Sequence, residues 1–363
     1  MPSLLREEIE RLFRNGKIKF LVCTSTLIEG VNLSCRTIVV RGPRKGKTQP
    51  MEAHDFWNLA GRAGRWGNEF HGNIICVDPE NGTAWPHGVP ERQRYPIRRE
   101  TDVVLSDAQS LLSFLNARLE METNAVSQQP QNEQVASYLL TTFMRDGSLS
   151  PSAFTKRHDP DFIARLNSAL TPLAASIEIP SSIAVRHSAV NAVGMQKLLT
   201  YFRLVDDEIE NYLPAAPESV DAYKRMTRIM GLVNDFLYPA FQPATIIPLH
   251  TLVVLEWLKG FSLSAIIRAR INYNQKNKRP VDIPKLIRST MEMVEQIARF
   301  RAPKYMSAYM DVLKFHLSSV GKSDLLLTNQ LDVGIALEFG VSTRTLLSLM
   351  ELGLSRIVPR QPP

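Results

Sequence analysis

At 363 residues the chain is long enough for two or three domains, and 44% apolar with 22% charged residues is a globular rather than a disordered composition. Its net charge of +7 and isoelectric point near 9.3 favour a polyanionic partner, although an ordinary basic protein has the same values. No apolar run reaches the roughly 18 residues of a membrane span, which argues against a membrane-spanning protein.

Two further features of the sequence indicate the compartment. Cys23, Cys35 and Cys76 lie in or beside apolar runs without the spacing of a metal site, so we expect reduced thiols in the core. Residues 1–10 mix acidic, basic and apolar side chains and do not resemble a secretory signal. We therefore expect a cytoplasmic protein.

The first hundred residues alternate between helix-like and strand-like patterns. Apolar residues at helical spacing predict a helix over 4–13, and a second helix is expected over 54–60. Short apolar runs over 17–24, 37–40 and 73–77 predict strands buried on both faces. This order indicates an α/β unit with a parallel sheet, whose open edge would be an aggregation hazard.

The remainder of the sequence predicts a helical region. A connector rich in proline and arginine is expected from Trp85 to Arg99. Beyond residue 101 the apolar residues recur at helical spacing, and no pair of segments has a convincing strand pattern. The predicted fold class is therefore a partial α/β unit followed by a mostly α-helical region.

Two short segments have the composition of a nucleotide-dependent machine. Gly61-Arg62-Ala63-Gly64-Arg65 places two arginines three residues apart among glycines, and guanidinium groups are suited to phosphate oxygens. An arginine brought to a nucleotide from a second lobe can accelerate phosphoryl transfer by roughly 10³–10⁵. Residues 24–32 (Thr-Ser-Thr-Leu-Ile-Glu-Gly-Val-Asn) form a hydroxyl-rich stretch suited to a nucleic-acid backbone. Each segment alone also fits an ordinary loop or strand end, and no Gly-x-x-x-x-Gly-Lys-Ser/Thr loop is present.

Together these segments resemble the fifth and sixth motifs of superfamily 2 helicases, in the DExH branch with Ski-like helical C-terminal domains. The two motifs lie at residues 21–33 and 56–65, and the resemblance covers residues 1 to about 99 and continues more weakly through the helical region. It implies that Arg65 is an arginine finger on the γ-phosphate of ATP, assisted by Arg62. Asn58 stands where the family usually has glutamine, so its contact is expected to be shorter or mediated by water. The implied nucleotide-binding residues are Gly30, Asn32, Asn58, Gly61, Arg62 and Arg65, and the implied nucleic-acid-binding residues are Thr24, Ser25 and Thr26.

The resemblance also implies a domain organisation. Residues 1–100 would be part of a second RecA-like lobe, residues 101–180 a winged-helix-like connector and residues 181–363 a helical, ratchet-like domain. The phosphate loop and the DExH motif of a first lobe are not found in the sequence. ATP and Mg²⁺ would then be shared with an N-terminal RecA-like lobe encoded upstream or in another chain, and this chain alone is expected not to hydrolyse ATP.

Two stretches of the helical half resemble helix-turn-helix steps. After the first, over 252–267, we expect a basic loop with Arg268, Arg270, Tyr273 and Lys276, which could follow a phosphate backbone and stack a base. A solvated basic loop is an equally good interpretation. The second lies over 331–352, with its turn at Gly340 and Ser342 as the cap, and its apolar second helix predicts a packed hairpin rather than a groove reader.

The leading hypothesis is the C-terminal fragment or subunit of an ATP-dependent helicase that acts on single-stranded or duplex DNA or RNA. A non-catalytic nucleic-acid-binding or scaffold protein, or an inactive remnant, is the alternative. The arginine pair favours the helicase, because a protein that only binds nucleic acid has no need of arginine fingers.

Overall fold

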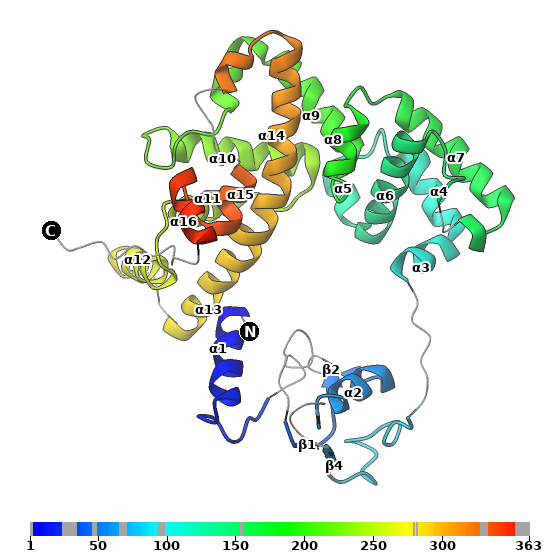
Figure 1. Cartoon of the computed structure of the whole chain (residues 1–363), viewed down its shortest axis with the longest axis vertical. Helices are drawn as coiled ribbons and strands as arrows, with labels where there is room; N and C mark the ends of the chain where they lie inside the picture. Colours follow the sequence, from blue (N-terminus) through cyan, green and yellow to red (C-terminus); the bar gives the residue numbers. More distant parts are fainter. Residues whose placement is uncertain are drawn as a thin grey trace. The chain divides into compact units, whose positions relative to one another are not determined.

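The computed structural model describes residues 3–23, 35–45, 49–64, 71–92, 99–152, 155–278, 280, 282–326 and 333–352. The chain divides into two compact units (Figure 1), which we call unit 1 (Met1–Ile97) and unit 2 (Arg98–Pro363). The fold class is as predicted, with a small parallel sheet in unit 1 and a helical unit 2. The division into three domains stays a prediction.

Unit 1 contains the predicted parallel pair of strands. β1 (Thr37–Val40) pairs with β4 (Asn73–Cys76), and Val39 lies opposite Ile75 in the register. The two predicted helices are also present, as α1 (Ser3–Arg14) and α2 (Ala53–Ala60). A short antiparallel pair, β2 (Arg44–Lys45) with β3 (Gln49–Pro50), had no sequence signal strong enough to predict it.

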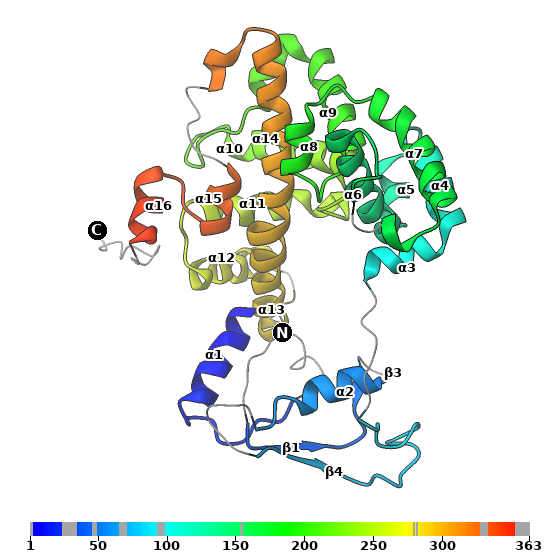
Figure 2. The ribbon, with the colours of Figure 1, turned by 45° about the vertical axis from the view of Figure 1, so that its right-hand side comes forward.

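A small core holds α2 against one face of the β1–β4 sheet (Figure 2). Phe56 of α2 is 2% exposed and packs edge-on against Trp85 with ring centroids 6.0 Å apart. The Trp85 indole Nε1 donates a hydrogen bond of 2.9 Å to the carbonyl of Val77, directly after β4. The connector predicted to begin at Trp85 therefore starts inside the core of unit 1, because this large ring fills the space beside Phe56.

The strand predicted over 17–24 is wrong for its described part, residues 17–23. Phe20 and Val22 are 91% and 99% exposed, and the described residues supply no strand that pairs with this segment. A strand is stable only with a hydrogen-bonded neighbour, so local apolar composition was not sufficient. The expectation of core thiols is also wrong, since Cys23 is exposed and Cys35 and Cys76 are half-buried; all three are free cysteines.

Unit 2 is built from helices only within its described residues. In chain order these are α3 (Glu100–Ser106), α4 (Ala108–Ala117), α5 (Thr123–Ser127), α6 (Pro130–Asp146), η2 (Thr155–Arg157), α7 (Pro160–Ala175), α8 (Ser181–Arg186), α9 (Ala192–Leu204), η3 (Asp206–Tyr212), α10 (Ala222–Leu232), η4 (Val233–Leu237), η5 (Ala244–Ile246), α11 (Ile247–Leu258), α12 (Leu263–Lys276), α13 (Ile283–Met293), η6 (Val294–Arg301), α14 (Ala302–Ser319), η7 (Ser323–Leu326), α15 (Val333–Phe339) and α16 (Arg344–Glu351). None of the described helices is long and apolar enough to cross a membrane.

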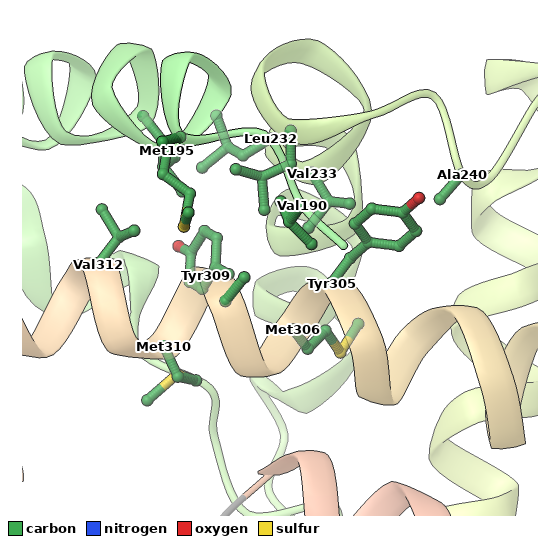
Figure 3. Packing of buried hydrophobic residues seen from close by; sticks show 14 of the residues in the cluster. Val190, Met195, Leu232, Val233, Ala240, Tyr305, Met306, Tyr309, Met310 and Val312 are labelled. Atoms are coloured by element: carbon green, nitrogen blue, oxygen red, sulfur yellow. The ribbon is translucent and has the colours of Figure 1, made fainter. Parts of the chain in front are cut away.

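Helix α14 is the centre of the unit 2 core. Tyr309 points toward Met195 and Val190, and Tyr305 extends toward Ala240 (Figure 3). Tyr309 is fully buried, and its hydroxyl donates a hydrogen bond of 2.9 Å to the carbonyl of Tyr212. The same apolar cluster extends from Val104 to Leu337, so one core spans both sides of the predicted boundary near residue 180.

A buried polar network also contains residues from both sides of the predicted boundary near residue 180. Arg118 and Glu133 form a bidentate ion pair at 2.8 and 2.9 Å, with side chains 4% and 9% exposed. Asn191 donates its side-chain Nδ2–H to the same carboxylate at 3.1 Å, and its Oδ1 accepts from the backbone N–H of Val193 to begin α9. The network therefore links residues that precede position 180 with residues beyond it.

The basic loop predicted around Arg268 is wrong, because Arg268, Arg270, Tyr273 and Lys276 lie on the helix α12. Between Leu263 and Lys276 there is no glycine or proline to interrupt a helix, and the side chain of Ser262 caps its first turn. Two residues are about 200° apart on a helix, so Arg268 and Arg270 point to nearly opposite sides. Arg268 is exposed, whereas Arg270 is half-buried and donates to Thr290 Oγ1 at 2.8 Å.

The second helix-turn-helix prediction is correct in its turn and wrong in its cap. Gly340, between α15 and α16, has φ +67°, a conformation that favours glycine. The hydroxyl that caps α16 belongs to Thr343, which accepts from the backbone N–H of Leu346 at 3.2 Å, and not to Ser342. The two residues have similar capping chemistry, so the sequence alone placed the helix start one residue early.

Candidate nucleotide and nucleic-acid site

The arginine segment continues directly from α2 and is attached to the start of the sheet. Gly61 ends α2 by donating its N–H to the Trp57 carbonyl at 2.9 Å. Ala63 then forms a parallel β-bridge with Cys35, in which Gly64 N–H donates to the Cys35 carbonyl at 3.0 Å. Cys35 also donates its N–H to the carbonyl of Arg62 at 3.3 Å. Residues 62–64 are thus held beside Cys35, two residues before β1 begins.

A contact between two glycines fixes the ends of the segment that contains Arg65. Gly64 has φ +67°, and a Cβ placed on it would lie 2.7 Å from the Cα of Gly72. A Cβ on Gly72 would lie 2.6 Å from the backbone N of Gly64. Real Cβ atoms essentially never come so close to a neighbour, so the two backbones can approach each other only because neither residue has a side chain. Sequence reasoning identified Gly64 by its motif and missed Gly72, whose only signal is that it is a glycine.

Replacing Gly72 by alanine is expected to destabilise unit 1 by about 1–3 kcal/mol, because the added methyl group forces the two backbones apart. Gly82→Ala is the matched control, since a Cβ at Gly82 in the same unit meets nothing within 4 Å. Three of the four tryptophans lie in unit 1, at positions 57, 66 and 85, so urea unfolding followed by tryptophan fluorescence reports on this unit. Equal midpoints for the two variants would contradict the close contact.

The described structure includes three of the nucleotide-binding residues predicted from the sequence. Asn58 is exposed on α2, on the side away from the buried Phe56 and Ala60. Gly61 is exposed in the turn, and Arg62 is half-buried with its Nε and Nη1 atoms shielded from solvent. The other predicted residues of unit 1, Thr24, Ser25, Thr26, Gly30, Asn32 and Arg65, lie outside the described residues.

Two other features of unit 1 could be taken for a nucleotide site. Gly46-Lys47-Thr48 has the ending of a phosphate loop, but it connects the antiparallel strands β2 and β3, whereas a phosphate loop connects a strand to a helix. A pocket of about 280 Å³ lies at the opposite end of α2 from Gly61. Its lining is mostly apolar and includes Pro43, Pro50, Met51, Trp85, Pro86 and Pro90, and none of the predicted site residues contributes to it.

The net charge of the chain is concentrated in one part of unit 2. Residues 259–304, which we call the basic segment, contain 11 Lys and Arg and three Asp and Glu, a net charge of +8. All other residues together carry a charge of −1. The segment covers α12, α13 and η6, and its exposed cations include Arg268, Lys276, Lys285, Arg288, Arg299 and Arg301. Tyr273 and Phe300 in the same segment are 56% and 63% exposed.

A cationic surface with exposed aromatic rings is suited to a nucleic-acid strand, because cations bind phosphates and rings stack on bases. Arg270 is an exception among the predicted binding residues. Its guanidinium is half-buried against Thr290, and this burial lowers the pKa of Arg270 from its ordinary value. The structure thus gives Arg270 a packing role in addition to its charge.

Residues 1–67 match the helicase conserved C-terminal domain. Residues 1–67 therefore have the sequence of a superfamily 2 helicase C-terminal part. We call residues 1–67 the helicase segment. It includes every residue that the sequence assigned to the nucleotide, together with Thr24, Ser25 and Thr26, whereas Gly72 and the basic segment lie beyond it.

Three curated relatives show sequence identity with up to a third of the chain. The chain is 32% identical to the Hachiman protein HamB of Bacillus cereus over 117 residues, which are 32% of this chain and 10% of that protein. It is 37% identical to anti-bacteriophage protein B of Escherichia coli over 92 residues, 25% of this chain and 12% of that protein. The ATP-dependent DNA helicase Hel308 of Aeropyrum pernix is 36% identical over 80 residues, 21% of this chain and 11% of that protein. The chain therefore matches about a tenth of the length of each of these relatives.

Within the described residues, no group of three or more His, Cys, Asp or Glu side chains is arranged to hold a metal ion. The described part of the helicase segment places the Arg62 guanidinium beside the turn after α2, and guanidinium groups suit phosphate oxygens.

Proposed function

We propose that this chain is the C-terminal part of an ATP-dependent nucleic-acid helicase of the DExH, Ski-like type. Arg65, assisted by Arg62, would stabilise the γ-phosphate of ATP that a separate RecA-like lobe holds with Mg²⁺, and unit 2 would hold the nucleic-acid backbone. The observation that carries the proposal is that a helicase segment is joined to a helical unit whose basic segment contains the entire net positive charge.

The geometry of unit 1 supports the proposal that residues 24–32 and residues 61–65 contact the same nucleotide. Cys35 lies three residues after Asn32, and Ala63 lies two residues before Arg65. The β-bridge between Cys35 and Ala63 therefore keeps the two motifs close, since three residues of chain span at most roughly 11 Å. Backbone groups from one motif and a guanidinium from the other could then contact the same nucleotide.

An uncovered face of the β1–β4 sheet supports the proposal of a partner lobe. Val39 and Ile75 lie opposite each other on the face that α2 does not cover, and they are 63% and 49% exposed. A parallel sheet is ordinarily covered on both faces. A RecA-like lobe that buries this face would stabilise unit 1 and bring its own phosphate loop, which favours the helicase over the stand-alone scaffold protein.

The basic segment allows a direct test of nucleic-acid binding. Changing Lys285 and Arg288, both exposed on α13, to glutamate is expected to weaken binding of a fluorescein-labelled 20-nucleotide single strand at least tenfold. The slope of log affinity against log salt concentration is expected to fall by about 1–2, because each lost phosphate contact removes about 0.7 from it. Fluorescence anisotropy between 50 and 200 mM salt measures both quantities.

The matched control for this test changes the same number of cations elsewhere in unit 2. Lys156 and Lys224 are exposed outside the basic segment, and Lys156→Glu with Lys224→Glu should alter affinity by less than about twofold. Equal losses in the two double variants would mean that only overall charge matters, and would contradict a site on the basic segment. Parallel titrations with single-stranded DNA, single-stranded RNA and duplex DNA would show which nucleic acid is preferred.

A further inference from the structure

Residues 17–23, which we call the exposed segment, combine the composition of a strand with high exposure to solvent. Phe20 and Val22 are 91% and 99% exposed, the highest values among the large apolar side chains described in unit 1. From Ile18 to Cys23 there is no glycine, proline or acidic residue, and β-branched and aromatic residues favour strands. Apolar segments that are open to solvent in this way are typical of surfaces that another chain covers.

The backbone of the exposed segment is also open. Gly16, with φ +70°, follows α1, and the N–H groups of Lys17 and Ile18 both donate to the Leu12 carbonyl, at 2.9 and 3.2 Å. Within the described part of the chain, no backbone hydrogen bond reaches residues 19–23 and no strand pairs with them. Their backbone donors and acceptors are therefore available to a neighbouring strand, which is the feature that allows an exposed edge to pair with another chain.

The side chains of the exposed segment alternate between two faces when the segment is extended. Ile18, Phe20 and Val22 fall on one face, which has no polar side chain. The other face has two cationic and two apolar residues, namely Lys17, Lys19, Leu21 and Cys23. Lysines on one face of a strand oppose the addition of further strands and sheets, so this pattern favours a limited assembly.

The exposed segment is complementary to a second copy of itself in one orientation. In an antiparallel pair centred on Phe20, this residue lies opposite its own copy, and Ile18 lies opposite Val22. Lys19 lies opposite Leu21, so no two lysines are directly opposed. A parallel pair in register would place each lysine opposite its own copy, and like charges in that position are destabilising. Charge and alternation therefore favour the antiparallel arrangement.

We propose that two copies of this chain associate through residues 17–23, paired as antiparallel strands about a two-fold axis at Phe20. Each copy supplies the hydrogen-bonded neighbour that the other lacks, and both Phe20 rings are removed from water. The same surface of both copies is used, so the assembly closes at the dimer. Because two strands alone form a marginally stable sheet, we expect weak association that depends on protein concentration. The inference does not depend on the proposed helicase function.

Sedimentation velocity of the full-length chain between about 1 and 100 µM measures the association. The mass should rise from 40.9 kDa toward twice that value. Phe20→Lys should raise the dissociation constant of the dimer at least about tenfold, because two lysines would then face each other at the axis. Val220→Lys is the matched control, since Val220 is an apolar residue of unit 2 that is 99% exposed, and it should change this constant by less than about twofold.

A disulfide test checks the antiparallel register. In a chain that carries Cys35→Ser and Cys76→Ser, Lys17→Cys places a thiol directly opposite Cys23 of the second copy, whereas Lys19→Cys places one diagonal to it. Directly opposed Cβ atoms lie about 4.5–5.5 Å apart and diagonal neighbours about 7–8 Å, and a disulfide needs the shorter separation. Oxidation by copper phenanthroline should therefore form the covalent dimer at least about tenfold faster with Lys17→Cys.

Several outcomes would overturn the inference. These are a chain that stays monomeric up to about 100 µM, equal effects of Phe20→Lys and Val220→Lys, equal cross-linking rates, and assemblies that grow beyond the dimer. A chain that is monomeric alone but has residues 19–23 protected from hydrogen exchange in a completed helicase would assign the exposed segment to the partner lobe instead.

The proposed function is tested separately. Phe20→Lys should bind the fluorescein-labelled 20-nucleotide strand within about twofold of the unmodified chain, because the basic segment is unchanged. An unmodified chain that forms the dimer but does not bind the strand would contradict the proposed function and leave this inference standing.

Discussion

Replacing Arg65 by alanine is expected to abolish ATP hydrolysis in a helicase completed by an N-terminal RecA-like lobe. An arginine finger stabilises the charge that develops on the transferred phosphoryl group, and its loss lowers the rate by roughly 10³–10⁵. The affinity of unit 2 for a single strand should stay within about twofold, because the basic segment lies outside the helicase segment. The measurement is phosphate release by the completed protein, together with anisotropy titration of the strand.

Arg65→Lys is the informative companion of this variant. Lysine keeps the charge but lacks the planar, bidentate geometry of guanidinium, so most of the activity should still be lost. Arg41→Ala is the control, because Arg41 is an exposed arginine of unit 1 whose partner is Asp78 at 3.1 Å. If Arg65→Ala weakened strand binding by the same factor as it weakened hydrolysis, Arg65 would be a nucleic-acid contact and not a finger.

Replacing Glu133 by glutamine is expected to destabilise unit 2 by about 3–5 kcal/mol. The substitution removes the charge that compensates Arg118, and both side chains are almost completely buried, so an unpaired guanidinium would remain in the core. Glutamine also accepts fewer hydrogen bonds than the carboxylate that binds both Arg118 and Asn191. Because unit 2 is largely helical, urea unfolding followed by far-ultraviolet circular dichroism reports its stability.

The Arg203–Glu178 pair provides the control for burial. It has the same bidentate geometry at 2.7 and 2.8 Å, but its side chains are 43% and 57% exposed, and Glu178→Gln should change the midpoint far less. Glu133 binds residues on both sides of position 180. Its loss should therefore lower the urea midpoint of one cooperative unfolding transition of unit 2. Two separate transitions after Glu133→Gln would indicate that residues 101–180 fold independently of the rest of unit 2.

Elements with strong local signals were predicted correctly. The amphipathic pattern of α1, the continuous apolar run of β1 and the run of β4 each identified their element, because helix and strand periodicities arise from the direction of successive side chains. The parallel pairing was predicted from the helix between the two strands, since parallel neighbours require such a crossover. The same reasoning was wrong for residues 17–23, because an apolar run becomes a strand only where a partner is present.

For the candidate site too, some features were predicted from the sequence and others were not. Arg62, Asn58 and Gly61 were predicted as nucleotide-binding residues from their resemblance to a motif, and their roles stay predictions. The partner of Gly64 was not predicted, because Gly72 acts through a backbone approach eight residues away that no side-chain pattern records. The α-helical state of Arg268 and Arg270 was likewise missed, since a basic composition does not distinguish an exposed loop from an exposed helix face.

Local periodicity was enough to predict the parallel α/β start and the helical remainder, and the resemblance to superfamily 2 helicases predicted the helicase match at the start of the chain. The sequence was not enough to predict which cationic side chains are exposed, because their exposure depends on the tertiary structure. Arg270 is half-buried and donates to Thr290 Oγ1, whereas Arg268, two residues before it on the same helix, is exposed. Burial at these positions is set by the packing of α12 against α11 and α13, and no local sequence pattern records such contacts.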